Sequence, residues 1–489
     1  PDLIEQIAEV TATELRVTGH DWTFAPTVAV PRDDRWGRTY EGFAEDPEVV
    51  ASYSPAIVEG LQGVFGEDDF LDETHVISTA KHYLGDGGTQ GGQDQGDTQV
   101  SEAELARIHG AGYPPAIEAG ALSIMATFSS WNGTKTTGDK HLLTDVLKDQ
   151  MGFDGFVVSD WNAHGQVVGC TNESCPEALI AGIDMFMAPD SWKGLYENTL
   201  AQAKSGEIPM ARLDDAVRRI LRAKLHYGLF EEGRPSERPL AGRTDLFGSP
   251  EHRAVARQAV RESLVLLKND GVLPILPSAK FLVAGDGADS ISKQAGGWTL
   301  TWQGGGIDND EFPNGASILD GLVEAASNVT HSPDGTYAQK PDVAIVVFGE
   351  DPYAEFRGDV DHLAYDADGS KEIELLRKFQ ADGIPTVSVF LSGRPMWVNP
   401  ELNASDAFVA AWLPGSEGAG IADLLIASAD GTPRHDFKGK LSYSWPKRPD
   451  QTPLNVGDAT YDPLFAYGYG LSYAEPGTVS DLDETVPDT

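Results

Sequence analysis

Two carboxylate residues each follow an apolar run of the kind that forms a buried β-strand. The run GFVVSDW (155–161) leads into Asp160, and DVAIVVFGE (342–350) ends in Glu350. Paired carboxyl groups placed at strand ends can divide nucleophilic attack and proton transfer between them. An acid after a strand is also a common turn former or helix cap, so the two positions alone leave both interpretations open.

The elements that would position Asp160 alternate between strand and helix. This alternation predicts parallel βα units in the first half of the chain. The predicted strands are 22–30, 75–85, 122–133, 155–161 and 184–189, and the predicted helices are 46–63, 101–120, 139–151 and 176–182. Polar residues stand at the strand ends, as in a (β/α)8 barrel, although about five units are present where a closed barrel needs eight.

The second half of the chain contains another βα series. An amphipathic helix (211–228) and a stretch rich in Gly, Pro, Arg and Ser (231–250) precede it. Its predicted strands are 280–289, 342–350, 386–394 and 407–415. The run VAIVVF is apolar at every position, which is typical of a parallel strand buried between two helix layers.

These patterns predict an α/β protein with two domains. We expect a TIM-like (β/α)8 barrel of which about five units are present, followed by an α/β/α sandwich; the family resemblance described below implies that the absent units are the N-terminal ones. The predicted boundaries are a barrel domain at 1–228, a linker at 229–250, a sandwich domain at 251–475 and an acidic tail at 476–489.

The charge balance narrows the classes of ligand. Asp and Glu number 76 against 36 Lys and Arg, a formal charge of −40. So acidic a surface repels nucleic acid and anionic membranes and suits a neutral or cationic ligand. Without an apolar run of about 18 residues, no membrane span is expected.

The two cysteines, Cys170 and Cys175, lie close together in GCTNESC. They are either two thiols in a loop or a short-loop disulfide, and a disulfide would indicate an oxidising compartment. Further Cys or His residues with metal-ligand spacing do not accompany them, so no metal site is predicted.

Nine segments in collinear order resemble glycoside hydrolase family 3, in particular its exo-acting β-glucan glucohydrolases and β-glucosidases. They are APTVAVPRDDRWGRTYEGFAEDP, AKHYLGDGGT, SSWNG, GFVVSDW, GGWTLTWQG, VVFGEDPYAE, LSGRP, AAWLPGSEG and YDPLFAYGYGLSY. The resemblance covers nearly the whole chain. It implies a barrel domain and an α/β/α sandwich with the active site between them, and no cofactor.

The resemblance also implies roles for the two acids. Asp160 matches the nucleophile of a retaining double displacement, in which the two carboxyl groups stand about 5–5.5 Å apart. Glu350 matches the acid/base position, and Glu355 is the runner-up. A general acid must hold its proton at neutral pH, so burial or a neighbouring carboxylate is expected to raise its pKa.

Further side chains match substrate contacts of the family. The Lys81–His82 pair and Arg38 are expected to bind sugar hydroxyls, with Asp86 orienting the pair. Trp161 and Trp298 match two indoles that enclose the glucosyl unit of the next subsite. Without the surrounding motif, a Lys–His pair would more often be a solvated loop.

One family feature has no counterpart in the sequence. The family carries an Asp that grips the non-reducing glucose on an early strand, upstream of the segment matching VTATELRVTGHDWTFAPTVAV. We therefore expect either a fragment or a barrel that another segment completes. The resemblance, together with a possible disulfide, predicts a secreted or periplasmic protein.

The predicted function is release of glucose from the non-reducing ends of β-1,3- and β-1,4-linked glucans, or from β-glucosides. A β-N-acetylglucosaminidase would carry a second His in the loop that reads KHYLGDGGT here. A β-xylosidase or a non-catalytic carbohydrate-binding relative remains an alternative. A nucleotide-binding protein is disfavoured, because GDGADSISKQAGG lacks an ordered GxGxxG.

Overall fold

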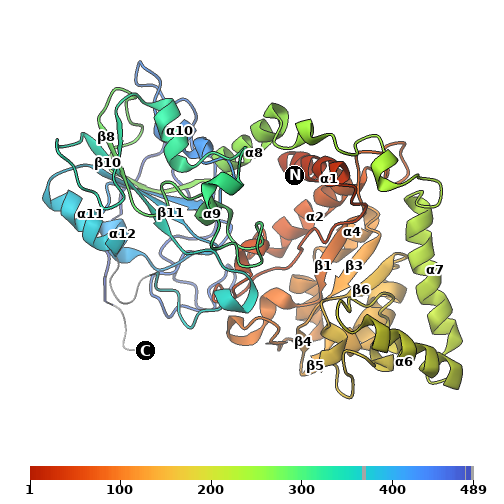
Figure 1. The fold of residues 1–489 in the computed structure, drawn as a ribbon. Coiled ribbons are helices and arrows are strands. Elements are labelled where there is room, and N and C mark those ends of the chain that lie inside the picture. Colours follow the sequence, from red (N-terminus) through yellow and green to blue (C-terminus); the bar gives the residue numbers. More distant parts are fainter. Residues whose placement is uncertain (366–370, 480, 486–489) are drawn as a thin grey trace. The chain divides into compact units, whose positions relative to one another are not determined.

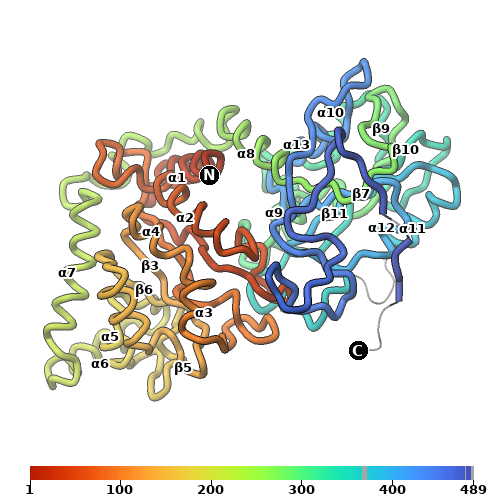
Figure 2. Tube along the Cα trace, turned by 180° about the vertical axis from the view of Figure 1, so that it is seen from behind, coloured from red at the N-terminus to blue at the C-terminus, as the bar shows by residue number. Residues whose placement is uncertain are grey.

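The computed structural model describes residues 1–365, 371–479 and 481–485. The chain divides into two compact units, shown in Figures 1 and 2. The first unit comprises residues 1–33 and 41–249, and the second comprises 34–40 and 250–489. The sequence places 34–40 in the first domain by continuity, whereas this segment packs with the second unit. Each unit is described by itself.

A parallel sheet forms the centre of the first unit. Its strands are β1 (Thr79–Tyr83), β3 (Ser123–Ala126) and β6 (Phe156–Ser159), in the order β1-β3-β6. Parallel bridges extend it on both sides, from Trp22 and Thr27 to β1 and from Met185 to β6. The five predicted strand runs therefore pair in chain order, which is the parallel βα arrangement expected of a barrel-like domain.

The α-helices of the first unit alternate with these strands in the chain, and some of them pack apolar side chains against the sheet. They are α1 (Asp2–Val17), α2 (Pro47–Gln62), α3 (Glu102–Glu104), α4 (Tyr113–Glu118), α5 (Pro176–Ala181), α6 (Trp192–Ser205) and α7 (Met210–His226). The helix predicted over 101–120 is interrupted by a π-helical turn, Leu105–His109, and by Gly110 and Gly112. The helix predicted near 139–151 is a π-helical segment, His141–Gln150. A second, small sheet of the first unit consists of β2 (Asp97–Thr98), β4 (Ser130–Trp131) and β5 (Thr134–Lys135).

The second unit is built on a six-stranded sheet with the order β7-β12-β11-β10-β8-β9. The strands are β7 (Val265–Asn269), β8 (Phe281–Ala284), β9 (Val329–His331), β10 (Val343–Gly349), β11 (Thr386–Leu391) and β12 (Ala407–Trp412). All neighbours are parallel except β7, which is antiparallel to β12. β10 is buried at every position, as its unbroken apolar run predicts.

Helices cover both faces of this second sheet. One core combines alternate strand residues with α8 (Pro250–Ser263), α10 (Ile318–Ala325) and α13 (Ala419–Leu425). The other core combines the remaining strand residues with α11 (Lys371–Ala381) and α12 (Asn399–Asn403). The short α9 (Ile291–Ala295) follows β8. This is the predicted α/β/α sandwich. Among the described residues, no helix is long and apolar enough to cross a bilayer.

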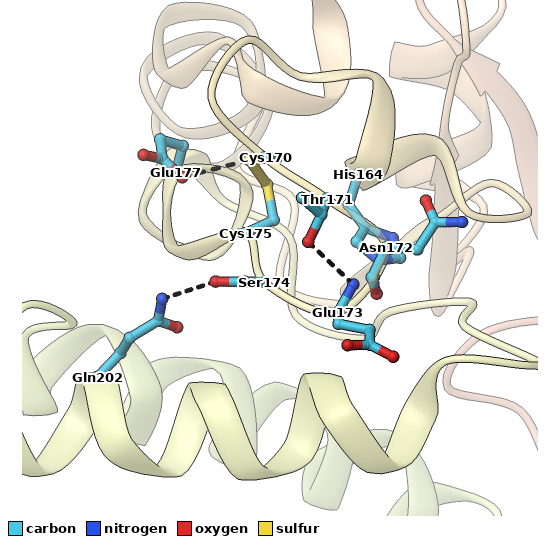
Figure 3. Close-up of a disulfide and its surroundings, with 9 residues drawn as sticks. All are labelled: His164, Cys170, Thr171, Asn172, Glu173, Ser174, Cys175, Glu177 and Gln202. Carbon is cyan, nitrogen blue, oxygen red and sulfur yellow. Dashed lines mark hydrogen bonds between the residues drawn. A yellow bond between two sulfur atoms is a disulfide. The ribbon is translucent and has the colours of Figure 1, made fainter.

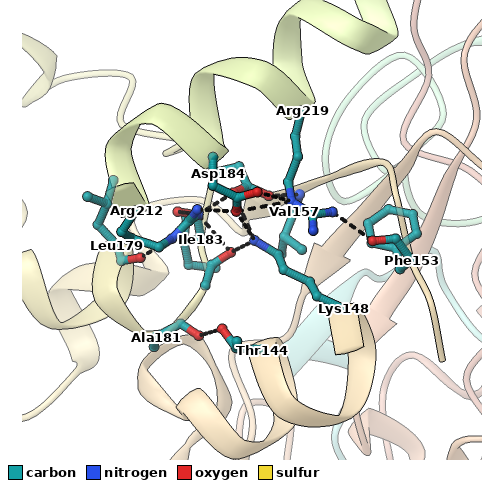
Figure 4. Close-up of polar contacts among 12 residues, drawn as sticks. Thr144, Lys148, Phe153, Val157, Leu179, Ala181, Ile183, Asp184, Arg212 and Arg219 are labelled. Atoms are coloured by element: carbon teal, nitrogen blue, oxygen red, sulfur yellow. Dashed lines mark hydrogen bonds and ion pairs between the residues drawn. The ribbon is translucent and has the colours of Figure 1, made fainter. Parts of the chain in front are cut away.

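A buried ion network holds α7 to the sheet of the first unit (Figure 4). It contacts β6 at Val157, near the start of the strand, whereas Asp160 follows its end. Asp184 has a fully buried side chain and accepts from the Val157 N–H at 2.8 Å. Lys148 Nζ lies 2.8 Å from Asp184 Oδ1, and Arg212 pairs with the same carboxylate. Burial lowers the pKa of Lys148 to about 8, although Asp184 opposes the shift. The network therefore serves stability, because strand N-terminal ends carry no chemistry in barrel folds.

Removing the Asp184 charge is expected to destabilise the protein strongly. Asp184→Asn leaves Lys148 and Arg212 with only the partly exposed carboxylate of Asp215 as a shared anion, so the free energy of unfolding should fall by about 3–5 kcal/mol. Urea denaturation followed by circular dichroism measures the loss. The control is Asp154→Asn, which breaks an exposed pair with Arg222 worth about 0–1 kcal/mol. Equal losses in the two variants would contradict the proposed role of the network.

Candidate active site

The strand ends of the first unit bring the predicted site residues His82 and Asp160 together. Tyr83, Ala126 and Ser159 are in register across β1, β3 and β6. His82 lies one residue before this row and Asp160 one residue after it. The carboxyl ends of the three strands therefore converge, as the parallel arrangement requires.

Asp160 is held on two sides. The backbone N–H of Trp161 donates to Asp160 Oδ1 at 2.7 Å, and His82 Nε2 lies 3.5 Å from Asp160 Oδ2. The residue is only 9% exposed. A carboxylate restrained in this way loses little further freedom when it attacks a bound carbon.

His82 is itself oriented by Asp86. Its Nδ1 lies 2.6 Å from Asp86 Oδ2, and both side chains are buried. Asp86 Oδ1 accepts from the hydroxyl groups of Thr127 and Ser129. The two carboxylates thus fix the imidazole between them, with Nε2 directed to Asp160.

Sequence reasoning missed Thr127 and Ser129 in this arrangement. Thr127 follows β3 directly, and its hydroxyl also accepts from the Ser129 N–H at 2.8 Å. Thr127 could have been predicted from its position at the end of β3, because β3 lies between the strands that carry His82 and Asp160. That prediction requires the strand order, which the sequence does not state.

The GDGGT loop (85–89) packs so closely against its neighbours that Gly87 and Gly88 have no room for a side chain. A Cβ on Gly87 would lie 2.3 Å from the backbone oxygen of Val30, and one on Gly88 would lie 2.3 Å from His109 Nε2. His109 is buried, and burial together with Arg32 lowers its pKa to about 4, so the ring is neutral. The loop that carries Asp86 can therefore approach its neighbours only without side chains.

The remaining predicted residues of the first unit differ in exposure. Trp161 is 57% exposed, which suits a surface that meets a ligand. Lys81 is half-buried on β1 next to His82. Both belong to the strand ends that carry Asp160.

Glu350 lies at the end of β10 in the second unit and is bound by three donors. Arg394 Nε donates at 3.1 Å, the Tyr353 hydroxyl at 2.9 Å and the Gly393 N–H at 3.0 Å. Burial would lower the pKa of Arg394, but Glu350 and Tyr353 raise it above its usual value. The recess lined by Glu350, Tyr353 and Gly393 has a volume of about 10 Å³, enough for a single water at most.

Glu355 occupies a different environment in the same unit. It begins a 3₁₀ turn, Glu355–Gly358, with a positive φ of 54°. Arg38 Nη1 lies 3.5 Å from its carboxylate, which is 14% exposed. A non-glycine residue in the left-handed region is strained, and such residues concentrate at functional sites.

Arg38 lies with Glu355 because residues 34–40 pack in the second unit. Arg394 holds this segment by donating to the backbone oxygens of Asp34 and Arg35. Trp298, also in the second unit, is 50% exposed and has a φ of 91°. The structure therefore places Arg38, Trp298, Glu350 and Glu355 in one unit and Lys81, His82, Asp86, Asp160 and Trp161 in the other.

The two cysteines form a disulfide in the loop after β6 (Figure 3). This loop is tied to its surroundings: His164 Nε2 donates to the Asn172 oxygen at 2.9 Å, and Gln202 of α6 donates to the Ser174 hydroxyl at 3.0 Å. Glu177 lies next to the sulfurs, but sulfurs joined in a disulfide are not thiolates and make poor metal ligands. The bond settles the choice between two thiols and a bridge.

An apolar cavity of the first unit contains none of the predicted site residues. It has a volume of about 470 Å³ and an apolar lining. It is lined by Phe186, Ala188, Trp192, Leu195, Tyr196, Thr199, Leu200, Ala203 and Leu213. A lining with so few polar groups offers little to position a sugar.

Comparison with known families identifies the class of protein. The glycosyl hydrolase family 3 N-terminal domain matches residues 1–223, and the glycosyl hydrolase family 3 C-terminal domain matches residues 264–473. These two matches correspond to the barrel-like unit and the sandwich. The chain belongs to glycoside hydrolase family 3.

Three relatives illustrate the similarity. A lysosomal beta glucosidase of Dictyostelium discoideum is 33% identical over 95% of this chain and 60% of its own length. A periplasmic beta-glucosidase of Salmonella typhimurium is 31% identical over 99% of this chain and 69% of its own length. A solved structure of an exo-1,3/1,4-beta-glucanase from a Pseudoalteromonas species is 54% identical, with a TM-score of 0.98 over all of this chain and 79% of that one. The chain thus spans about three fifths to four fifths of these relatives.

Packing under the Asp86 loop leads to a prediction. Gly87→Ala would push a Cβ against the Val30 backbone, which cannot move aside as a side chain can. We expect the free energy of unfolding to fall by about 1–3 kcal/mol. The matched control is Gly305→Ala, whose Cβ would meet nothing within 4 Å. Thermal denaturation compares the two variants, and equal midpoints would refute the packing argument.

Proposed function

We propose that this chain belongs to a retaining exo-β-glucosidase that releases glucose from the non-reducing ends of β-1,3- and β-1,4-linked glucans. The observation that carries the proposal is the Asp160 carboxylate, fixed by the Trp161 N–H and His82 at the converged strand ends. The substrate class is supported by the 54% identity to an exo-1,3/1,4-beta-glucanase. The reaction requires no cofactor.

In the proposed mechanism Asp160 attacks the anomeric carbon as the glycosidic C–O bond breaks and the acid/base glutamate protonates the departing oxygen. The same glutamate then takes a proton from water, which hydrolyses the glycosyl-enzyme ester and releases the sugar and Asp160. Lys81, His82 and Arg38 are proposed to bind sugar hydroxyls, with Asp86 orienting His82. Trp161 and Trp298 are proposed to face the apolar C–H surfaces of the next glucosyl unit.

We favour Glu355 over Glu350 as the acid/base. The sequence predicts Glu350, but its carboxylate is already bound by three donors, Arg394, Tyr353 and the Gly393 N–H. The recess beside Glu350 is also too small for a sugar. Glu355 stands in a strained turn next to Arg38, a residue expected to contact substrate.

A second activity, β-xylosidase, is favoured by one observation. A beta-xylosidase of Formosa agariphila is 30% identical over 97% of this chain. The two activities differ by one hydroxymethyl group of the sugar, which only the shape of the pocket can select. Relative kcat/KM values on an aryl β-glucoside and an aryl β-xyloside separate these alternatives.

A secreted or periplasmic location is proposed for the protein. The Cys170–Cys175 disulfide supports it, because such bonds persist mainly in oxidising compartments. The similarity to a periplasmic beta-glucosidase agrees with it.

Loss of the Asp160 charge tests the nucleophile. Asp160→Asn should lower turnover of an aryl β-glucoside by about 10⁴-fold or more, since the covalent route is removed while the fold is retained. Circular dichroism checks the fold, and Asp154→Asn serves as an exposed control. Near-normal turnover would refute the assignment. Absence of turnover in the unmodified full-length protein, with sugar binding intact in Asp160→Asn, would instead favour a non-catalytic carbohydrate-binding relative.

Paired variants test the acid/base. Glu355→Gln should lower kcat/KM on β-glucan oligosaccharides far more than on aryl glucosides, because a good leaving group needs no proton. Glu350→Gln should instead lower the free energy of unfolding by about 3–5 kcal/mol, because Arg394 loses its buried partner. Steady-state kinetics and urea denaturation on both variants provide the measurement. The opposite pattern, with leaving-group dependence in Glu350→Gln and instability in Glu355→Gln, would restore the original prediction.

A further inference from the structure

Ser159, the last residue of β6, has a hydroxyl group that no step of the proposed mechanism uses. The side chain is fully buried. Its Oγ accepts a hydrogen bond from the Met187 N–H at 2.9 Å and donates to the backbone oxygen of Asp160 at 3.1 Å. The hydroxyl group therefore joins the backbone of the proposed nucleophile to the segment that pairs with β6 at Met185.

This hydroxyl group takes the place of a backbone acceptor at the end of a parallel strand pair. The Met185 N–H donates to the Val157 oxygen at 3.1 Å, and the Met185 oxygen accepts from the Ser159 N–H at 2.9 Å. Continuation of the ladder would require the Met187 N–H to donate to the Ser159 backbone oxygen. It donates to the Ser159 side chain instead, so the pairing is completed while the backbone is free to turn at Asp160.

Met187 holds the chain on both sides of Asp160. Its N–H binds the Ser159 hydroxyl group, and its backbone oxygen accepts from the Asn162 N–H at 2.9 Å. Between these two bonds, the Ala163 N–H donates to the Asp160 oxygen at 3.1 Å and closes a four-residue turn. Asp160 thus lies between two residues that are bonded to the same partner.

We propose that Ser159 is a positioning residue for Asp160. The inference rests on the proposed function and names a further residue on which the first step of that reaction depends. One carboxylate oxygen of Asp160 accepts from the Trp161 N–H, which belongs to the turn that the Ser159 hydroxyl group fixes. Supporting hydrogen bonds of this kind keep a reactive group in its productive geometry. A displacement of about 1 Å can slow a reaction about 10²-fold.

The proposal assigns the role to the hydroxyl group itself. Ser159→Ala leaves the Met187 N–H without its acceptor and the Asp160 oxygen without one of its two donors. Ser159→Thr keeps an oxygen on the same Cβ, which can still accept and donate. A role in stability alone predicts a different result, because every folded molecule would then retain its full reactivity.

Covalent labelling of the full-length protein measures the attack by Asp160 without help from the acid/base. The reagent is a 2-deoxy-2-fluoro-β-glucoside with a dinitrophenyl leaving group. Asp160 would form an ester with the anomeric carbon as dinitrophenolate departs with the bonding electrons. For Ser159→Ala we expect the labelling rate at saturating reagent to fall about 10²-fold. The reagent concentration that gives half of this rate should change less than about two-fold, since the sugar contacts are retained.

Two further variants control for changes in folding. Ser159→Thr should label at close to the unmodified rate. Ser123→Ala is the matched control, because Ser123 begins β3, is fully buried, and has a hydroxyl group without a partner among the described residues. It should also label at the unmodified rate. Unchanged labelling in Ser159→Ala, an equal loss in Ser123→Ala, or an equal loss in Ser159→Thr would overturn the proposal.

A second background separates this inference from the proposed function. Mass spectrometry locates the label, and labelling of the unmodified protein at Asp160 establishes the nucleophile whatever the Ser159 variants do. In Asp160→Asn, adding Ser159→Ala should not lower the residual turnover of an aryl β-glucoside further, because the hydroxyl group acts through the carboxylate. An equal loss in both backgrounds would overturn the positioning role and leave the nucleophile intact. Absence of labelling in the unmodified protein would refute the hydrolase and the positioning role together.

Discussion

The register of three parallel strands is the constraint on which the site of the first unit depends. Tyr83, Ala126 and Ser159 form a row across β1, β3 and β6, and the polar residues at their ends share one edge. A series of side-chain contacts from Asp86 to His82 to Asp160 runs along that edge, and Thr127, which follows the middle strand, donates to Asp86. A shift of a single residue in any strand would turn its side chains to the opposite face and break the contacts.

The strand register also has to be held in place, and the buried ion network of Asp184, Lys148 and Arg212 contributes to this. The proposed chemistry lies at the carboxyl ends of the strands, while Asp184, Lys148 and Arg212 fasten α7 at the other end. The ion network and the proposed reactive residue therefore lie at opposite ends of β6. The fold can hold a restrained carboxylate at Asp160 because the opposite end of the strand is secured independently.

Two glutamates of the second unit show how neighbours decide the role of a carboxyl group. Glu350 and Glu355 are five positions apart in the same loop, and both are mostly buried. Glu350 is saturated by Arg394, Tyr353 and the Gly393 N–H, so its charge organises the loop. Glu355 stands in a strained turn beside Arg38. The loop then has a structural acid at its base and a proposed reactive acid near its tip.

Much of the fold follows from the sequence alone. The five apolar runs of the first half and the unbroken run VAIVVF predicted parallel strands, because burial on one or both faces leaves a periodic pattern in the chain. The interrupted helix at 101–120 was harder to foresee, because tertiary packing sets where its π-helical turn lies. The sequence also indicated Asp160, His82 and Asp86, since strand ends can be located from pattern and motif.

Other features were decided only by tertiary structure, because they depend on partners distant in the chain. Residues 34–40 join the second unit through Arg394, more than three hundred positions away. The bond between Cys170 and Cys175, the support of Asp86 by Thr127, and the contrast between Glu350 and Glu355 all depend on which groups meet in space. A sequence states which residue types are present and how they alternate, whereas hydrogen bonds and burial, which set the charge and freedom of each side chain, arise only when the strands have paired.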